Sequence, residues 1–187
     1  MNPDVVEGPP EEMDDPESVA RGICLRALTG APKTRQQLAD LLAGRGVPDD
    51  AAETVLDRFT EVGLIDDAAF ARAWVSSRQA GRGLARRALS AELRAKGVDP
   101  EVAAEAVEEV DDEDERAAAR RLVERRAGAM RRLDRATATR RLMGMLARKG
   151  YSGGLAAAVV REVLDDVAVD DAAGDEFDDL DVDSLLP

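Results

Sequence analysis

One pattern of leucines and a glycine occurs three times in this chain of 187 residues, and it restricts the folds available to it. In each copy, leucines stand eight and four residues before a glycine that follows a basic residue. The copies are Leu38, Leu42 and Gly46; Leu89, Leu93 and Gly97; and Leu142, Leu146 and Gly150. The glycines are 51 and 53 residues apart, a period that accommodates three short helices. The sequence therefore predicts a tandem repeat fold.

Each copy carries the local signals of a helix that ends at its glycine. Leucines four residues apart lie on one helical face. Glycine is favoured just after a helix, where the backbone turns left-handed, and a preceding base interacts well with the helix dipole. Helix starts are also marked: Thr34 with Gln37 forms a capping box, and Asp66 can cap a helix that begins near Asp67. Prolines at the first turn open two further helices, at Pro48 and Asp99-Pro100.

We expect helices at about residues 18–29, 35–44, 49–61, 67–80, 83–96, 100–110, 113–127, 135–149 and 153–166, and no strands. The predicted fold class is all-α, with three tandem three-helix repeats that form an elongated, curved, solenoid-like array. The predicted boundaries are 18–66, 67–111 and 112–166 for the repeats, 1–17 for an acidic disordered N-terminal arm and 167–187 for an acidic disordered C-terminal tail.

The composition excludes several kinds of function. The chain has no histidine and one cysteine, so it can contain neither a catalytic triad with a histidine base nor a zinc site of histidine and cysteine. Cys24 stands between Ile23 and Leu25 and is expected in the core. No apolar run is long enough for a membrane span, and the acidic N-terminus is unlike a signal peptide. We therefore expect a cytoplasmic, non-enzymatic protein without a cofactor or a metal.

The net charge of −13 conceals an uneven distribution of charge. Residues 165–187 carry ten carboxylates and no base, whereas residues 68–98 hold seven bases against one acid and residues 116–150 hold twelve against two. Local basic segments of this kind favour a polyanionic or acidic partner despite the acidic whole.

The arginines of the two basic segments are predicted to share exposed helix faces. On a helical wheel, the apolar residues of 83–96 fall on one side and the arginines on the other, and 135–149 behaves in the same way. Arg87 and Arg140 occupy the same repeat position, as do Lys96 and Lys149. We predict a surface for a partner or DNA formed by Arg82, Arg86, Arg87, Arg94, Lys96, Arg125, Arg126, Arg131, Arg132, Arg140, Arg141, Arg148 and Lys149.

Two alternatives concern individual side chains. The arginines could simply solvate helix faces or pair with acids such as those of 111–115, although the local acids are too few to neutralise all of them. Phe70 and Trp74, four residues apart, are expected in the core, whereas a role in base stacking would require exposed aromatic rings.

The central segment resembles the signature of the RecX regulatory family. The resemblance is carried by Gly63-Leu64-Ile65-Asp66-Asp67, Phe70-Ala71, Trp74-Val75, Arg78, Gly83, Arg87, Glu92-Leu93-Arg94 and Lys96-Gly97-Val98, and it extends over about residues 18–166. One departure is Leu64, where the family often has an aromatic residue. The resemblance implies three tandem three-helix repeats. It also implies a protein that binds the RecA recombinase and its nucleoprotein filament, and that restrains ATP hydrolysis, strand exchange and stimulated self-cleavage of the SOS repressor.

Other functions remain open at this stage. Thr34–Ala39 followed by Gly46-Val47 is similar to a helix-turn-helix opening, but residues 21–67 sum to about −2, which is unfavourable for a DNA-binding module. A purely structural adaptor that binds a protein partner is another alternative. An enzyme is the weakest, because the carboxylates fall in solvated runs and no glycine-rich phosphate loop is present. Direct contact with single- or double-stranded DNA is an open alternative to contact with RecA, and we expect a monomer.

Overall fold

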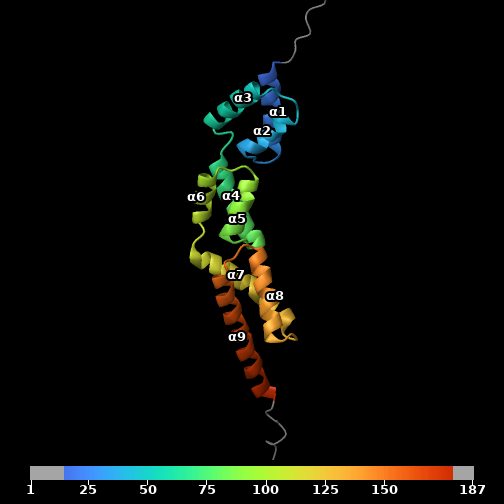
Figure 1. The fold of residues 1–187 in the computed structure, drawn as a ribbon, viewed down its shortest axis with the longest axis vertical. Coiled ribbons are helices and arrows are strands. Elements are labelled where there is room, and N and C mark those ends of the chain that lie inside the picture. The colour runs from blue at the N-terminus through green and yellow to red at the C-terminus, as the bar shows by residue number, and fades with distance from the viewer. Residues whose placement is uncertain (1–14, 179–187) are drawn as a thin grey trace, which may run out of the picture. The chain divides into compact units, whose positions relative to one another are not determined.

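The computed structural model describes residues 15–178, with side chains through residue 168. In chain order its helices are α1 (Pro16–Gly30), α2 (Arg35–Ala43), α3 (Asp49–Glu61), α4 (Asp67–Arg82), α5 (Arg86–Ala95), α6 (Pro100–Glu108), α7 (Asp112–Ala127), α8 (Arg135–Arg148) and α9 (Gly153–Asp178), with a 3-10 turn η1 (Gly128–Met130) between α7 and α8 (Figure 1). Over the described range there are no strands. The all-α class and the tandem three-helix repeats are therefore confirmed, whereas the curvature of the array stays a prediction.

The repeated positions of the sequence form the centres of the helical packing. All six leucines of the pattern are fully buried. Gly46, Gly97 and Gly150 have φ angles of 74°, 75° and 89°, in the left-handed region that glycine adopts most easily. The pattern thus predicted both the buried face of each middle helix and the residue that ends it.

The described residues form two compact units. Unit 1 comprises the chain up to Phe70 together with Lys96–Val98, and unit 2 comprises Ala71–Ala95 and the chain from Asp99 onward. In unit 1, α1, α2 and α3 pack against one another around a core that includes Cys24, Leu38 and Phe59. Burial of Cys24 agrees with its predicted place in the core, and it raises the pKa of the thiol.

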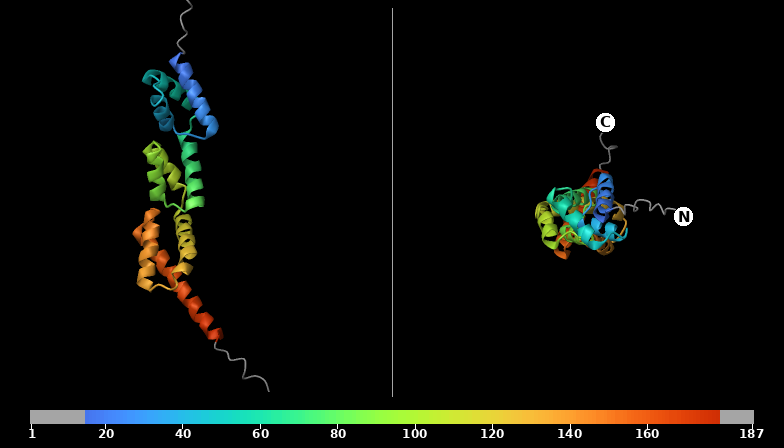
Figure 2. Two further views of the ribbon diagram at one scale, coloured as in Figure 1. Left: turned by 90° about the vertical axis from the view of Figure 1, so that its right-hand side faces the viewer. Right: turned by 90° about the horizontal axis from the view of Figure 1, so that it is seen from above.

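In unit 2, α7 and α8 both pack against α9, and α5 packs against α6 (Figure 2). The core of the α7–α9 bundle contains Leu122, Leu142 and Val160 and also includes Ala85, which stands just before α5. Among the described residues, no helix is sufficiently long and apolar to cross a membrane.

Helix starts agree with the predicted capping residues. Thr34 and Gln37 form a complete capping box, the side chain of Asp99 accepts from Glu101 N, and that of Asp66 accepts from Ala69 N. Each of these bonds satisfies a backbone amide that has no partner within its own helix.

Two helix boundaries differ from the expectation by three residues or more, and α1 begins at Pro16, within the arm of 1–17 that was predicted to be disordered. The helix expected at 83–96 begins at Arg86, because Gly83 is left-handed with φ of 57° and Ala85 N donates to Lys149 O rather than into a helix. The last helix was expected to end near residue 166 with disorder beyond it, but α9 continues through Asp178. The predicted disorder of residues 1–14 and 179–187 lies outside the described residues.

The C-terminal ends of two middle helices make the same kind of contact within their units. In unit 1, the Thr34 hydroxyl donates to Lys96 O at 2.7 Å. In unit 2, Ala85 N, at the repeat position of Thr34, donates to Lys149 O at 3.0 Å. Lys96 and Lys149 are themselves equivalent, so the repeats share this contact as well as their helices.

Candidate basic interaction surface

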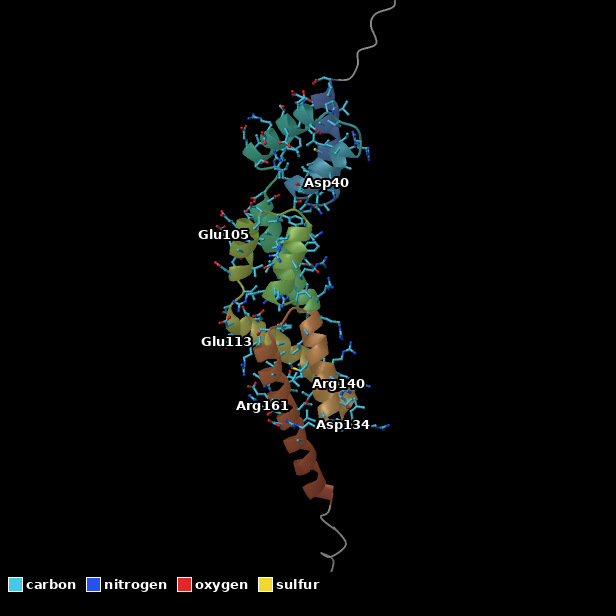
Figure 3. The ribbon with its side chains drawn as sticks, in the orientation of Figure 1. Asp40, Glu105, Glu113, Asp134, Arg140 and Arg161 are labelled. Carbon is cyan, nitrogen blue, oxygen red and sulfur yellow. The ribbon has the colours of Figure 1, made fainter. Side chains whose placement is uncertain are left out.

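Arg87 on α5 and Arg140 on α8 are the two equivalent arginines that the sequence placed on an exposed face. Both side chains are exposed, and neither forms an ion pair with any residue that the structure describes. In Figure 3, Arg140 lies on the side of unit 2 formed by α8, whereas Glu105 and Glu113 lie on the side formed by α6 and α7. Arg140 therefore lies on a different side of unit 2 from these two glutamates.

The residues that follow in the repeat explain why these arginines point outward. Leu89 and Leu142, two residues after Arg87 and Arg140, are fully buried. A residue two positions away from a buried leucine is rotated by about 200° around a helix axis, toward the opposite side. The exposed position is thus fixed by the apolar pattern, as predicted.

Four arginines line one cleft between α7 and α8. This cleft of about 390 Å³ is lined by Arg126, Arg140, Arg141 and Arg148, together with Met130 and Met145. None of the four arginines pairs with a carboxylate within residues 15–168. The remaining predicted arginines Arg94, Arg125 and Arg132 are also exposed and lack such a pair in that range.

Lys149, which follows α8, contacts the segment just before α5. Its ammonium donates to Arg82 O, and the Tyr151 hydroxyl donates to Gly83 O at 3.1 Å. Burial lowers the pKa of Lys149, and the nearby charges of Arg82, Arg125 and Arg126 lower this pKa further. Burial is the larger cause, and the three arginines add positive charge beside this ammonium.

Arg86 differs from its neighbour Arg87 because carboxylates hold it. Its guanidinium pairs with Asp112 and with Glu115, the latter at 3.0 Å, and its backbone amide donates to Glu115 at 2.9 Å. The hydrogen bond that Arg86 donates to Asp112 is the main cause that raises the pKa of Arg86. Arg35, at the same repeat position in unit 1, is paired in the same way with Glu53 and Asp57. Arginine at this repeat position therefore contributes ion pairs within its own unit. The guanidinium of Arg86 is already paired and is less available to a binding partner.

A polar cluster around Trp74 was not predicted from the sequence. Trp74 is half-buried, its indole N–H donates to Glu92 at 3.0 Å, and the guanidinium of Arg78 lies 4.0 Å from the ring centroid. Arg82 also pairs with Glu92, at 2.9 Å. Phe70 is half-buried as well, so the pair borders the core rather than filling it. The spacing of Trp74, Arg78 and Arg82 along one helical face is the signal that could have indicated this cluster.

The remaining predicted residues lie outside these groups. Arg131 lines a second cleft of unit 2, of about 360 Å³, beside Arg120 and Asp166. Lys96 is partly buried at the end of α5, where its carbonyl accepts from Thr34. The helix-turn-helix alternative in unit 1 is weakened because Thr34 is fully buried and Arg35 is paired with acids, so neither side chain at the start of α2 is available for phosphates.

Comparison with known proteins places all three repeats in one family. The chain matches the models of the first, second and third three-helix domains of RecX over residues 20–59, 66–107 and 112–160. It is 58% identical over 163 residues to the regulatory protein RecX of Streptomyces lividans, covering 87% of each chain. It is 49% identical over 155 residues to the regulatory protein RecX of Mycobacterium marinum, covering 81% of this chain and 90% of the relative. The fold is similar to the crystal structure of RecX from Lactobacillus salivarius, with a TM-score of 0.75 and 19% identity over 80% of this chain and 97% of that one.

Proposed function

This chain belongs to the RecX family of regulatory proteins, and from that premise we propose that it binds the RecA recombinase filament on DNA and restrains its activity. The activities affected would be ATP hydrolysis, strand exchange and stimulated self-cleavage of the SOS repressor. The proposal combines the family's regulatory role with the signature around Gly63–Val98 and with the basic surface of unit 2.

The observation that supports this proposal most is the pair of equivalent exposed arginines, Arg87 and Arg140, without carboxylate partners within residues 15–168. A guanidinium presents several donors in a planar fork, which suits carboxylates and phosphates. Both kinds of group occur on a filament of protein on DNA. A basic position that recurs in successive repeats is suited to a partner that is itself repetitive.

The proposed mechanism is occlusion and requires no chemistry. Each exposed arginine contributes a weak contact, because charges at a surface are screened by water and salt. Several such contacts on one chain act at high effective concentration once the first has formed. Binding across adjacent filament subunits would then block growth of the filament or fix its conformation.

The test is inhibition of the single-strand-dependent ATPase of RecA by substoichiometric protein. We expect the double variant Arg87→Glu with Arg140→Glu to lose inhibition while retaining its helicity, because both side chains are exposed and glutamate is compatible with a helix. The matched control is Arg72→Glu with Arg161→Glu, which reverses two other exposed arginines of unit 2. Full inhibition by the first double variant, or equal loss in the control, would count against this surface.

Direct binding of DNA is the second candidate, and the four arginines that line the cleft between α7 and α8 favour it. Fluorescence anisotropy with single-stranded DNA in the absence of RecA, at several salt concentrations, separates the two. Contact with phosphates gives an affinity that falls steeply as salt rises. We also propose that the chain acts in the cytoplasm as a monomer, which light scattering at micromolar concentration can test.

A further inference from the structure

The cleft between α7, η1 and α8 has properties beyond those of a flat basic surface. Its volume of about 390 Å³ falls within the range of about 300–1,000 Å³ that small-molecule sites occupy. Arg126 enters from α7, Met130 from η1, and the other lining residues from α8. The cleft lies entirely within unit 2, so its geometry depends on one packed bundle.

None of the four guanidiniums of the cleft pairs with a carboxylate within residues 15–168, and three acids of unit 2 are engaged elsewhere. Asp134 caps α8 by accepting from Thr137 N, an interaction that lowers the pKa of its carboxyl. Asp165 pairs with Arg135 at 2.5 Å, and Asp166 pairs with Arg120 at 2.6 Å. The cleft is therefore a concentrated positive site, and the potential that lowers the pKa of Lys149 arises partly from Arg126.

We propose that this cleft is a binding site for a compact polyphosphate anion of the nucleoside triphosphate class. Adjacent phosphoryl groups, each with about one or more negative charges, can satisfy several guanidiniums within one small volume. A phosphodiester strand carries only one charge per nucleotide, about one per 3.4 Å of helix axis on each strand of a duplex, and would leave some guanidiniums unsatisfied. An acidic peptide has a still lower density of charge in the same space.

The apolar part of the lining suits the base of a nucleotide. Met130 and Met145 line the cleft, are partly buried and pack against the core of the bundle, so the lining includes polarizable thioether side chains. Methionine sulfur makes favourable contacts with aromatic rings, and guanidinium planes stack on them. The phosphates would meet the arginines while the base lies on the methionines.

Substitution of Gly144 by a larger apolar residue would fill the cleft without altering its charge. This glycine lines the cleft in the middle of α8, and a Cβ at this position would lie 3.5 Å from Arg148 Nη1, an ordinary contact. A leucine here is compatible with the helix and improves its propensity. The leucine side chain would occupy the space in which we propose that the ligand binds.

The experiment is calorimetric titration of the full chain with inorganic tripolyphosphate and with ATP in magnesium-free buffer. We expect one site per chain, and a loss of affinity of about tenfold or more in Arg140→Gln with Arg141→Gln, since each charged hydrogen bond contributes strongly. Gly144→Leu should weaken both ligands with net charge unchanged. The control Arg72→Gln with Arg161→Gln should remain within about twofold of the wild type, because distant exposed charges are screened.

Three results would overturn the proposal. They are equal loss of affinity in the control variant, full binding by Gly144→Leu, and tighter binding of a short thymidine oligonucleotide or an acidic peptide than of ATP. The first two indicate general electrostatic attraction, and the third indicates a surface for a strand or a protein segment. No RecA is present in this experiment, so its failure leaves the proposed regulation of the filament untouched.

Discussion

Substitution of Gly150 by alanine should destabilise the chain much more than the same substitution at Gly46. The two glycines occupy equivalent repeat positions and have similar left-handed φ angles of 89° and 74°. They differ in their surroundings. A Cβ on Gly150 would lie 2.7 Å from both the backbone nitrogen and the Cβ of Ala88, whereas a Cβ on Gly46 would have no heavy atom within 4 Å.

The expected magnitudes follow from these distances. A non-glycine residue in the left-handed region costs about 1–2 kcal/mol, and this cost applies to both variants. Gly150→Ala also forces α8 away from the backbone of α5, and overpacking of this kind costs about 1–3 kcal/mol more. The junction hydrogen bonds of Ala85 N and Tyr151 Oη lie beside the displaced segment and would weaken. We therefore expect losses of about 1–2 kcal/mol for Gly46→Ala and about 2–5 kcal/mol for Gly150→Ala.

The assay is urea denaturation followed by far-ultraviolet circular dichroism, with the free energy of unfolding taken from the linear extrapolation. Trp74 is the one tryptophan of the sequence and belongs to unit 2, so its fluorescence reports separately on the unit that contains Gly150. Equal losses in the two variants would refute the reasoning, because the close approach to Ala88 would then contribute nothing.

Two further predictions concern the junction between α5, α7 and α8. Glu115→Gln should lower the free energy of unfolding by about 1–3 kcal/mol, because this carboxylate is only 12% exposed, pairs with Arg86 and accepts from its backbone amide. The control Glu113→Gln, at an exposed residue, should change it by less than about 0.5 kcal/mol. Thermal or urea unfolding measures both. Comparable effects of the two would argue against stabilisation through the contacts of Glu115 with Arg86. Burial, with a smaller contribution from Glu115, raises the pKa of Tyr151 to about 12. The unfolded tyrosine loses its proton first, near pH 10, so stability should fall by roughly 2 kcal/mol as pH rises from about 10 to about 12. Ultraviolet titration of this single tyrosine measures the pKa directly, and a stability profile of Tyr151→Phe with the same slope would contradict the assignment.

The sequence by itself determined the repeat architecture and much of the candidate surface. Apolar spacing, capping residues and glycines after a base are local signals, because each depends on the geometry of one helix and its ends. They were sufficient to predict the buried leucines, the left-handed Gly97 and Gly150, and the exposure of Arg87 and Arg140. The start of α5 was misplaced because Ala85 bonds to Lys149, which is distant in the sequence.

Only the tertiary structure decided which arginines have no carboxylate partner within the described residues and can pair with another molecule. Arg86 and Arg87 are adjacent in one basic segment, yet Arg86 is paired with Glu115 on α7 while Arg87 is exposed without a carboxylate partner in the described range. The cleft of Arg126 and Arg140 likewise exists because α7 and α8 are brought together by α9. Helical periodicity specifies the direction of a side chain around its own axis. The charge opposite that side chain depends on packing between elements, which the local pattern does not encode.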